Sequence, residues 1–452
     1  MRQLLIKYPN KFRAILFNKL TAHVTICFSI HAGAEQESRT LSGASHIIER
    51  MIKANLILET NKFGGVVESS VDSELINWTI STTREHIEDS LKILSTAIFG
   101  FFPKSSAFEM QKAKVLQEIE KKKFNPMAIL TDITKRQLYH GTTLSLEVIG
   151  SAKSVSELTI QQIKDFYTKI LSPQNISLSI VGDIGDREII DISNKNAVVN
   201  GQIADISGFD QLWMVPNKDE EVVLKNYKTT DSLNEIQKLV NNYFYSSTLK
   251  LESKHKSRAV KYISLNKPVF ISKLKTLNQT RFQITFPSAP YLSSGYKYAK
   301  LIEAYLTYYI RGELLKELNV YSVDISVIGC KNNGHLSISF AVDNEVANDR
   351  YNTVMKLLKQ IATEGISNAE FESLKNMYET TVSIYHESSV KVANRFNKWI
   401  LIKDEVFNLN NEIASIRAMT YENFVYTLKH ILDFNKILVV MLGRKNDDFK
   451  PF

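Results

Sequence analysis

The feature that most constrains the fold is an internal repeat. The stretch from Leu158 to Gly182 matches the stretch from Met419 to Gly443 at a constant offset and without a gap. In each copy, an amphipathic helix pattern leads into an apolar strand pattern that ends at a glycine. A repeated helix–strand unit predicts two halves built on one plan, which excludes a single doubly wound parallel sheet.

We therefore predict an α+β fold of two pseudo-duplicated domains, each a mixed, largely antiparallel sheet with helices packed on one face. The first domain is placed at residues 1–249 and the second at 259–452, joined by a charged linker over 250–258. Residues 184–232 show no sustained period and are predicted to be an insertion with some strand content.

The hydrophobic period and the turn-forming residues predict the individual helices and strands. Ser367 and Glu370 have the spacing of a capping box at the start of a helix. Strands are predicted at 3–8, 12–17, 22–32, 66–81, 176–182, 260–265, 269–275, 281–286, 321–328 and 334–342. Helices are predicted at 85–99, 107–123, 127–138, 160–170, 233–245 and 296–318.

Composition is that of an ordinary soluble globular protein, with 44% hydrophobic and 23% charged residues in a chain of 452. The net charge of +8 is spread along the sequence. This distribution favours a solvated basic surface, or a functional basic patch, over a nucleic-acid-binding protein. Cys27 and Cys330 lie far apart, so a disulfide scaffold is excluded and a reducing, cytoplasmic location is expected. No window predicts a signal peptide or a membrane span.

The chemically informative stretch runs from Ser42 to Ile52, where Ser42 is predicted to cap a helix. His46, Glu49 and Arg50 are spaced i, i+3 and i+4, so their side chains share one helix face. This is the inverted zinc motif H-x-x-E-H with arginine at the second histidine. Because arginine is permanently charged and has no lone pair for a metal, it is expected to pair with a carboxylate instead.

The order of these features resembles the pitrilysin/insulinase-type (inverzincin) metallopeptidase family, in the two-domain form of the mitochondrial processing peptidase subunits and bacterial relatives. The resemblance covers nearly the whole chain apart from the insertion at 184–232. It rests on the order and spacing of eight segments: Pro9–Leu16, His31–Glu35, Ser42–Met51, Phe63–Val67, Val115–Pro126, Ile149–Ser151, Ser179–Asp183 and Glu364–Glu372.

Position by position, the resemblance implies that His46 matches the first zinc ligand, Glu49 the general base and Glu118 the third ligand. Arg50 stands at the second ligand, so Glu118 is expected to pair with Arg50, and zinc is expected to be weak or absent. Read without the family, His46 and Glu49 would be surface residues of an amphipathic helix.

The resemblance also implies a strand that pairs with extended peptide, carrying Val66, Val67, Glu68, Ser69 and Ser70. In the second half, Tyr321 matches a substrate-facing tyrosine, although it is equally consistent with a packed strand residue. Glu317 stands where active members of the family have an arginine.

Three functions remain open. The first is a non-catalytic subunit that binds peptide and pairs, as a heterodimer, with an active relative carrying an intact H-x-x-E-H. The second is an active zinc endopeptidase that uses a substitute or partner-supplied ligand. The third is a purely structural subunit. We favour the first because His46, Glu49 and Glu118 are retained while the ligand set is broken. Neither nucleic acid nor membrane is expected as a partner.

Overall fold

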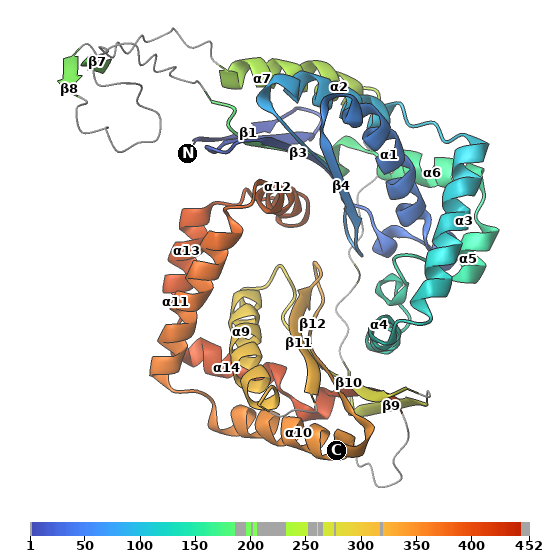
Figure 1. The fold of residues 1–452 in the computed structure, drawn as a ribbon, viewed down its shortest axis with the longest axis vertical. Helices are drawn as coiled ribbons and strands as arrows, with labels where there is room; N and C mark the ends of the chain where they lie inside the picture. Colours follow the sequence, from blue (N-terminus) through green and yellow to red (C-terminus); the bar gives the residue numbers. More distant parts are fainter. Residues whose placement is uncertain are drawn as a thin grey trace, which may run out of the picture.

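The chain folds into two halves of the same design, each a sheet that carries helices (Figure 1). Most of the predicted insertion and of the predicted linker lies outside the described residues. Within the insertion, the structure describes a short hairpin of β7 (Asn196–Val199) and β8 (Gln202–Asp205). The computed structural model describes residues 2–185, 196–199, 202–205, 232–251, 260, 265–274, 277–316 and 320–443.

The first sheet has six strands in the order β1-β2-β6-β3-β5-β4. Its pairs are antiparallel except β2–β6, which is parallel. Strand β4 lies at one edge and pairs only with β5 among the described strands. The bounds are β1 (Arg2–Lys7), β2 (Arg13–Asn18), β3 (Val24–Ile30), β4 (Val66–Val71), β5 (Ile76–Thr82) and β6 (Ile176–Gly182).

The second sheet repeats this plan with five strands in the order β11-β12-β10-β13-β9. Again all pairs are antiparallel except one, β13–β9. The five strands of the second sheet therefore correspond to β2, β6, β3, β5 and β4 of the first, with β13 in the place of β6, as the repeat predicted. Strand β1 has no counterpart among the described residues, and most of the strand predicted at 260–265 lies outside them. The bounds are β9 (Val269–Leu274), β10 (Gln279–Pro287), β11 (Val320–Gly329), β12 (Gly334–Asp343) and β13 (Leu438–Gly443).

The helices follow the predicted order, and the capping box of Ser367 and Glu370 is formed. The first half contains α1 (Ala44–Thr60), α2 (Ile87–Phe99), α3 (Ser105–Lys122), α4 (Pro126–Leu138), α5 (Ala152–Glu157), α6 (Ile160–Ile170), α7 (Ser232–Val240) and α8 (Ser246–Thr248). The second half contains α9 (Gly295–Leu314), α10 (Ala347–Glu364), α11 (Asn368–Tyr385), α12 (Ser389–Lys398), α13 (Leu409–Arg417) and α14 (Tyr421–Ile431). π-helical turns follow α7 at Asn241–Tyr245 and α12 at Trp399–Lys403.

One predicted strand is wrong in its extent. Residues 66–81 form the hairpin β4–β5 rather than one continuous strand. The chain reverses at Asp72, whose carboxylate accepts hydrogen bonds from the backbone N–H groups of Glu74 and Leu75 at 2.7 and 2.8 Å. An aspartate that bonds the backbone two residues ahead is a turn signal, and this reversal leaves β4 at the edge of the sheet.

The first sheet is covered on both faces, and the second cover comes from the other half of the chain. Side chains alternate across a strand, so Leu16 faces the core under α1 and α2 while Phe17 faces the opposite side. On that opposite side Phe17 packs edge-on against Phe396 of α12, with ring centroids 5.4 Å apart. In Figure 1, α12 lies on the side of the first sheet away from α1 and α2.

The second sheet is covered in the reciprocal way. Leu130 and Leu138 of α4, a helix of the first half, pack on Leu438 and Val440 of β13. Each half thus gives one helix to the sheet of the other half, which holds the two halves together through buried apolar surface. The predicted helices on one face of each sheet are confirmed, and these exchanged helices add a second cover. None of the helices that the structure describes combines the length and the apolar composition of a membrane-spanning segment.

Candidate functional site at the start of helix α1

Helix α1 begins at a buried carboxylate rather than at the predicted serine cap. Gly43 adopts a left-handed conformation with φ of 99°, and its N–H and that of Ser45 donate to Glu37 at 2.9 and 2.7 Å. Burial raises the pKa of Glu37 to about 7, against the opposing effect of these two donors. Ser42 instead donates to the backbone oxygen of Glu147 at 3.4 Å. The first turn of α1 is therefore fixed from within the protein.

The predicted face of α1 looks toward helix α3. His46 places Nε2 3.3 Å from a carboxylate oxygen of Glu118 and Nδ1 3.6 Å from a carboxylate oxygen of Glu49. Arg50 pairs through Nη1 with the second carboxylate oxygen of Glu118, and its Nε donates to Gln111 at 3.4 Å. The structure thus brings together all four residues that the motif singled out. Gln111, also on α3, was not anticipated.

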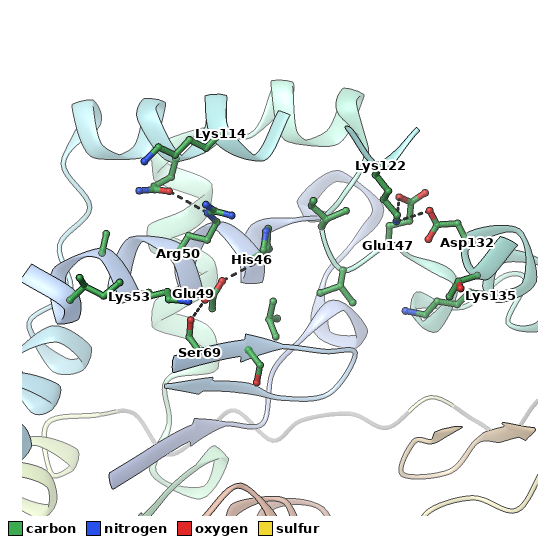
Figure 2. Close-up of a pocket in the computed structure, with 18 residues that line it drawn as sticks. His46, Glu49, Arg50, Lys53, Ser69, Lys114, Lys122, Asp132, Lys135 and Glu147 are labelled. Atoms are coloured by element: carbon green, nitrogen blue, oxygen red, sulfur yellow. Dashed lines mark hydrogen bonds and ion pairs between the residues drawn. The ribbon is translucent and has the colours of Figure 1, made fainter. Parts of the chain in front are cut away.

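Glu49 is held against the edge strand rather than pointing freely into the site. Only 5% of this residue is exposed. The Ser69 hydroxyl of β4 donates to one of its carboxylate oxygens, and the Trp78 indole donates to its backbone oxygen at 3.1 Å. Figure 2 shows Glu49 between His46 and Ser69. Sequence reasoning placed Ser69 on a peptide-pairing strand but did not anticipate this contact with Glu49.

The residues present do not fit a catalytic zinc ion. Such a site normally has three protein ligands and an open position for water. Here the matching set is reduced to His46 and Glu118, and the Arg50 guanidinium occupies one oxygen of that carboxylate. A permanent cation one helical turn from His46 also opposes a dication electrostatically. Among the described residues, no group of three or more histidine, cysteine or acidic side chains is arranged to hold a metal ion.

The site opens into a pocket of about 830 Å³ between α1, α3, α4 and the end of β4. Ser69, Ser70 and Val71 of β4 line it beside His46, Glu49 and Arg50. Figure 2 labels Ser69 and these three residues of α1. Additional charged residues line it that sequence reasoning did not assign to the site: Lys53, Lys114, Lys122, Asp132, Lys135 and Glu147. Lys122 pairs with Asp132 at 2.5 Å and Glu147 at 3.0 Å. The signal for these lysines was weak, because scattered lysines in a basic chain resemble a solvated face.

The remaining predicted substrate residues are distributed differently. Val66 is exposed on the edge strand, and Val67 packs partly into the core of the first half. Tyr321 lies at the start of β11, on the edge of the second sheet, and is not part of the described lining of this pocket. Glu317 lies outside the described residues. The peptide-binding roles of β4 and Tyr321 therefore remain predictions.

Two family models match this chain. The model described as "Insulinase (Peptidase family M16)" matches residues 13–152, and the one described as "Peptidase M16 inactive domain" matches residues 231–378. The first matched region includes helix α1 with its motif. The second matched region includes the start of the second half. The chain belongs to peptidase family M16.

Proteins with quite different descriptions are similar to this chain. Cytochrome b-c1 complex subunit 1 of Caenorhabditis elegans is 23% identical over 41% of this chain and 43% of its own length. The uncharacterized zinc protease YmxG of Bacillus subtilis is 23% identical over 40% of this chain and 47% of its own length. The human mitochondrial-processing peptidase subunit alpha is 19% identical over 41% of this chain and 37% of its own length. The chain thus matches less than half the length of each of these relatives.

Solved structures match this chain over nearly its whole length. A protease from Helicobacter pylori has a TM-score of 0.79 at 14% identity and covers 98% of this chain and 99% of its own. An M16 inactive-domain protein from Pseudomonas fluorescens has the same TM-score at 12% identity, with full coverage of both chains. At these identities the likeness establishes the two-domain fold and leaves the activity to the site.

Proposed function

We propose that this chain is a non-catalytic M16 subunit that binds peptide and works with a partner carrying an intact H-x-x-E-H motif. One observation carries the proposal: Arg50 stands at the second ligand position and pairs with Glu118, the third. The ion pair neutralises a carboxylate that would otherwise stand beside Glu49 without a cation. A chain with this site needs a partner to hydrolyse a peptide.

Peptide binding is supported by the position of β4. An edge strand presents unpaired backbone N–H and C=O groups, to which an extended peptide adds as a further strand. The pocket lies directly at this edge, so side chains of the peptide would reach it. Ser69 to Val71 line the pocket, and Val66 is 60% exposed.

A structural subunit is the second candidate. It is supported by the similarity to cytochrome b-c1 complex subunit 1 and by the fold likeness to a chain of "Complex III2 from Candida albicans", with a TM-score of 0.71 at 14% identity. The exposed β4 and its pocket favour peptide binding over this candidate, because a purely structural chain has no need of either. A cytoplasmic location belongs to the first proposal, since Cys27 and Cys330 are both free thiols.

The proposal is tested by mixing the purified chain with catalytically intact M16 chains from the same source. Light scattering measures association, and cleavage of unfolded fluorogenic peptides measures activity. We expect no cleavage by this chain alone, a heterodimer with one intact partner, and faster cleavage by the pair than by that partner alone. Chelator-sensitive cleavage by the chain alone would establish the active-peptidase alternative. Assembly without any effect on cleavage and without peptide binding would favour the structural alternative.

A further inference from the structure

A second pocket, of about 320 Å³, lies where the end of β4 meets the C-terminal half. Ser70, Asp72 and Asn77 line it from the first half, and aromatic side chains from α9, α11 and the segment after α12 line the remainder. Five basic residues also line it: Lys297, Lys300, Arg395, Lys398 and Lys403. We call this the basic pocket.

The basic side chains of this pocket fall into two groups. Lys297 pairs with Glu412 at 3.0 Å, and Lys300 pairs with Glu303. Arg395, Lys398 and Lys403 have no ion pair within 4 Å in the part of the chain that the structure describes. These three come from α12 and the π-helical turn that ends it, a distortion common at functional sites.

Aromatic rings hold these three cations in place without neutralising them. The Lys403 ammonium lies 3.8 Å from the centroid of the Trp399 ring. The Lys398 ammonium lies 4.6 Å from that of Tyr291, and the Arg395 guanidinium lies 4.2 Å from that of Tyr385. Cation–π contacts attract a cation through the ring quadrupole and leave its charge available to an anion.

The electrostatics of the pocket favour an added negative charge. Burial lowers the pKa of Lys403. The negative charge of Glu412 raises this pKa, and the positive charge of Lys297 lowers it. Burial raises the pKa of Tyr291 and Tyr296, so their phenol groups stay protonated and remain hydrogen-bond donors at neutral pH. Asp72 and Glu412 are the carboxylates in the described lining, fewer than the five basic residues.

Strand β4 connects this pocket to the site on α1. Ser69 points to Glu49 on one face of the strand, whereas the Ser70 hydroxyl accepts a hydrogen bond from Asn77 at 3.2 Å on the other face. Ser70 lines the basic pocket as well as the pocket at α1. Side chains of a peptide added to β4 would alternate between the same two faces. One set would face the pocket of His46 and Arg50, and the other set would face the basic pocket.

We propose that the basic pocket binds a carboxylate of a peptide paired with β4, either an acidic side chain or the C-terminal carboxylate. This inference rests on the proposed peptide-binding function and names the feature by which the chain selects its peptides. Arg395, Lys398 and Lys403 supply the positive charge. The aromatic rings beside them form the uncharged walls of the pocket and exclude water there.

Fluorescence anisotropy with the full-length chain tests the proposal. The probes are four N-terminally labelled peptides of one extended, Val/Thr-rich sequence of about nine residues. They carry Glu or Gln at one internal position and end in a free carboxylate or an amide. We expect at least one carboxylate to tighten binding by roughly tenfold over the fully neutral peptide, and the preference to weaken as salt is added.

A matched pair of variants locates the effect. The Lys398→Gln/Lys403→Gln double variant should lose the preference for carboxylate while keeping its affinity for the neutral peptide. Lys356→Gln/Lys429→Gln removes the same number of charges from exposed positions of the second half outside the basic pocket and should keep the preference. A thermal melt of each variant verifies folding, and the salt dependence of the unaltered chain needs no variant.

The outcomes are distinct. A preference for Glu over Gln identifies a side-chain carboxylate, and a preference for free acid over amide identifies a C-terminal one; both support the proposal. Equal affinity for all four peptides overturns it and leaves the peptide-binding function standing. A preference that survives in the double variant overturns it as well. If none of the four peptides binds, the proposed function fails together with this inference.

Discussion

The two halves of this M16 chain share one scaffold and differ in what fills the same place on it. In the first half, the helix that follows the central strand carries His46, Glu49 and Arg50 toward Glu118 of α3. In the second half, α9 occupies the corresponding place, and its contacts with α11 belong to an apolar cluster that includes Tyr305. A duplicated fold therefore places a helix at the same position in each half, and the side chains that this helix carries decide what kind of site can form there.

The exchanged helices link the two halves through buried apolar side chains. Phe396 of α12 is 1% exposed and packs on Phe17 of the first sheet. Phe396→Ala should lower the free energy of unfolding by about 3–5 kcal/mol, because it removes a buried ring and leaves a cavity. Denaturant titration measures the change, and Ile384→Ala, at a 67% exposed position, serves as the control. Two separate unfolding transitions in the unaltered chain would contradict this link.

The next effect concerns pH at the junction of the halves. Glu35 and Glu74 accept hydrogen bonds at 2.6 Å from the N–H groups of Val260 and Lys331 in the second half. Burial raises the pKa of both carboxyls from 4.5 to about 7. The negative charges of Glu74 and Asp72 add to the effect on Glu35, and that of Asp72 adds to the effect on Glu74. The folded state therefore holds these protons to higher pH than the unfolded state. The stability they contribute is complete below about pH 4.5 and is lost as pH rises to about 7.

The size of this loss is on the order of 3 kcal/mol for each group. The Glu35→Gln/Glu74→Gln variant keeps an oxygen to accept each hydrogen bond but does not ionise. Its stability relative to the unaltered chain should therefore rise between pH 5 and 8, as measured by denaturant titration across that range. Parallel pH profiles for the two proteins would show that these carboxyls ionise as they do in water.

The third effect concerns the metal ligand that is missing from α1, the helix that carries the His46–Glu49–Arg50 motif in the first half. Arg50→His removes the cation and restores a histidine at the second ligand position, so affinity for zinc should rise by about tenfold or more over that of Arg50→Gln. Elemental analysis after equilibration with zinc and gel filtration measures the stoichiometry. Arg50→Gln is the matched control, because it removes the charge without adding a ligand. Equal zinc content in the two variants would mean that His46 and Glu118 are not placed for a metal.

The smallest effect expected is that of the Arg50–Glu118 pair on stability. The side chains are 28% and 36% exposed, so solvent screens their attraction. A double-mutant cycle with Arg50→Gln and Glu118→Gln should give a coupling energy of about 0.2–1 kcal/mol. A coupling above this range would assign the pair a structural role that its exposure does not predict.

The sequence predicted the parts of the molecule that repeat or have a fixed spacing. The match of Leu158–Gly182 with Met419–Gly443 anticipated both sheets, because a repeated helix–strand unit folds in the same way twice. The spacing of His46, Glu49 and Arg50 anticipated their shared face, and the charge of Arg50 anticipated its pairing with Glu118.

What the sequence did not reveal depends on long-range packing. The apolar face of α12 indicates burial but does not say which sheet it covers. Lys398 and Lys403 look like ordinary charges until the fold places aromatic rings beside them. Ser42 resembles a helix cap, but the carboxylate of Glu37 takes that position because the preceding loop brings it there. The position of Tyr321 likewise depends on how the second sheet is oriented.

The exchange of helices has a consequence for synthesis on the ribosome. The face of the first sheet that carries Ile15, Phe17 and Val181 is covered by residues of α12, more than 200 residues further along the chain. Until that helix emerges, the first half exposes a strip of apolar side chains to solvent and to other nascent chains. We therefore expect chaperones to bind the first half during synthesis. The risk of aggregation falls when α12 covers the first sheet, and not when the first half alone has been made.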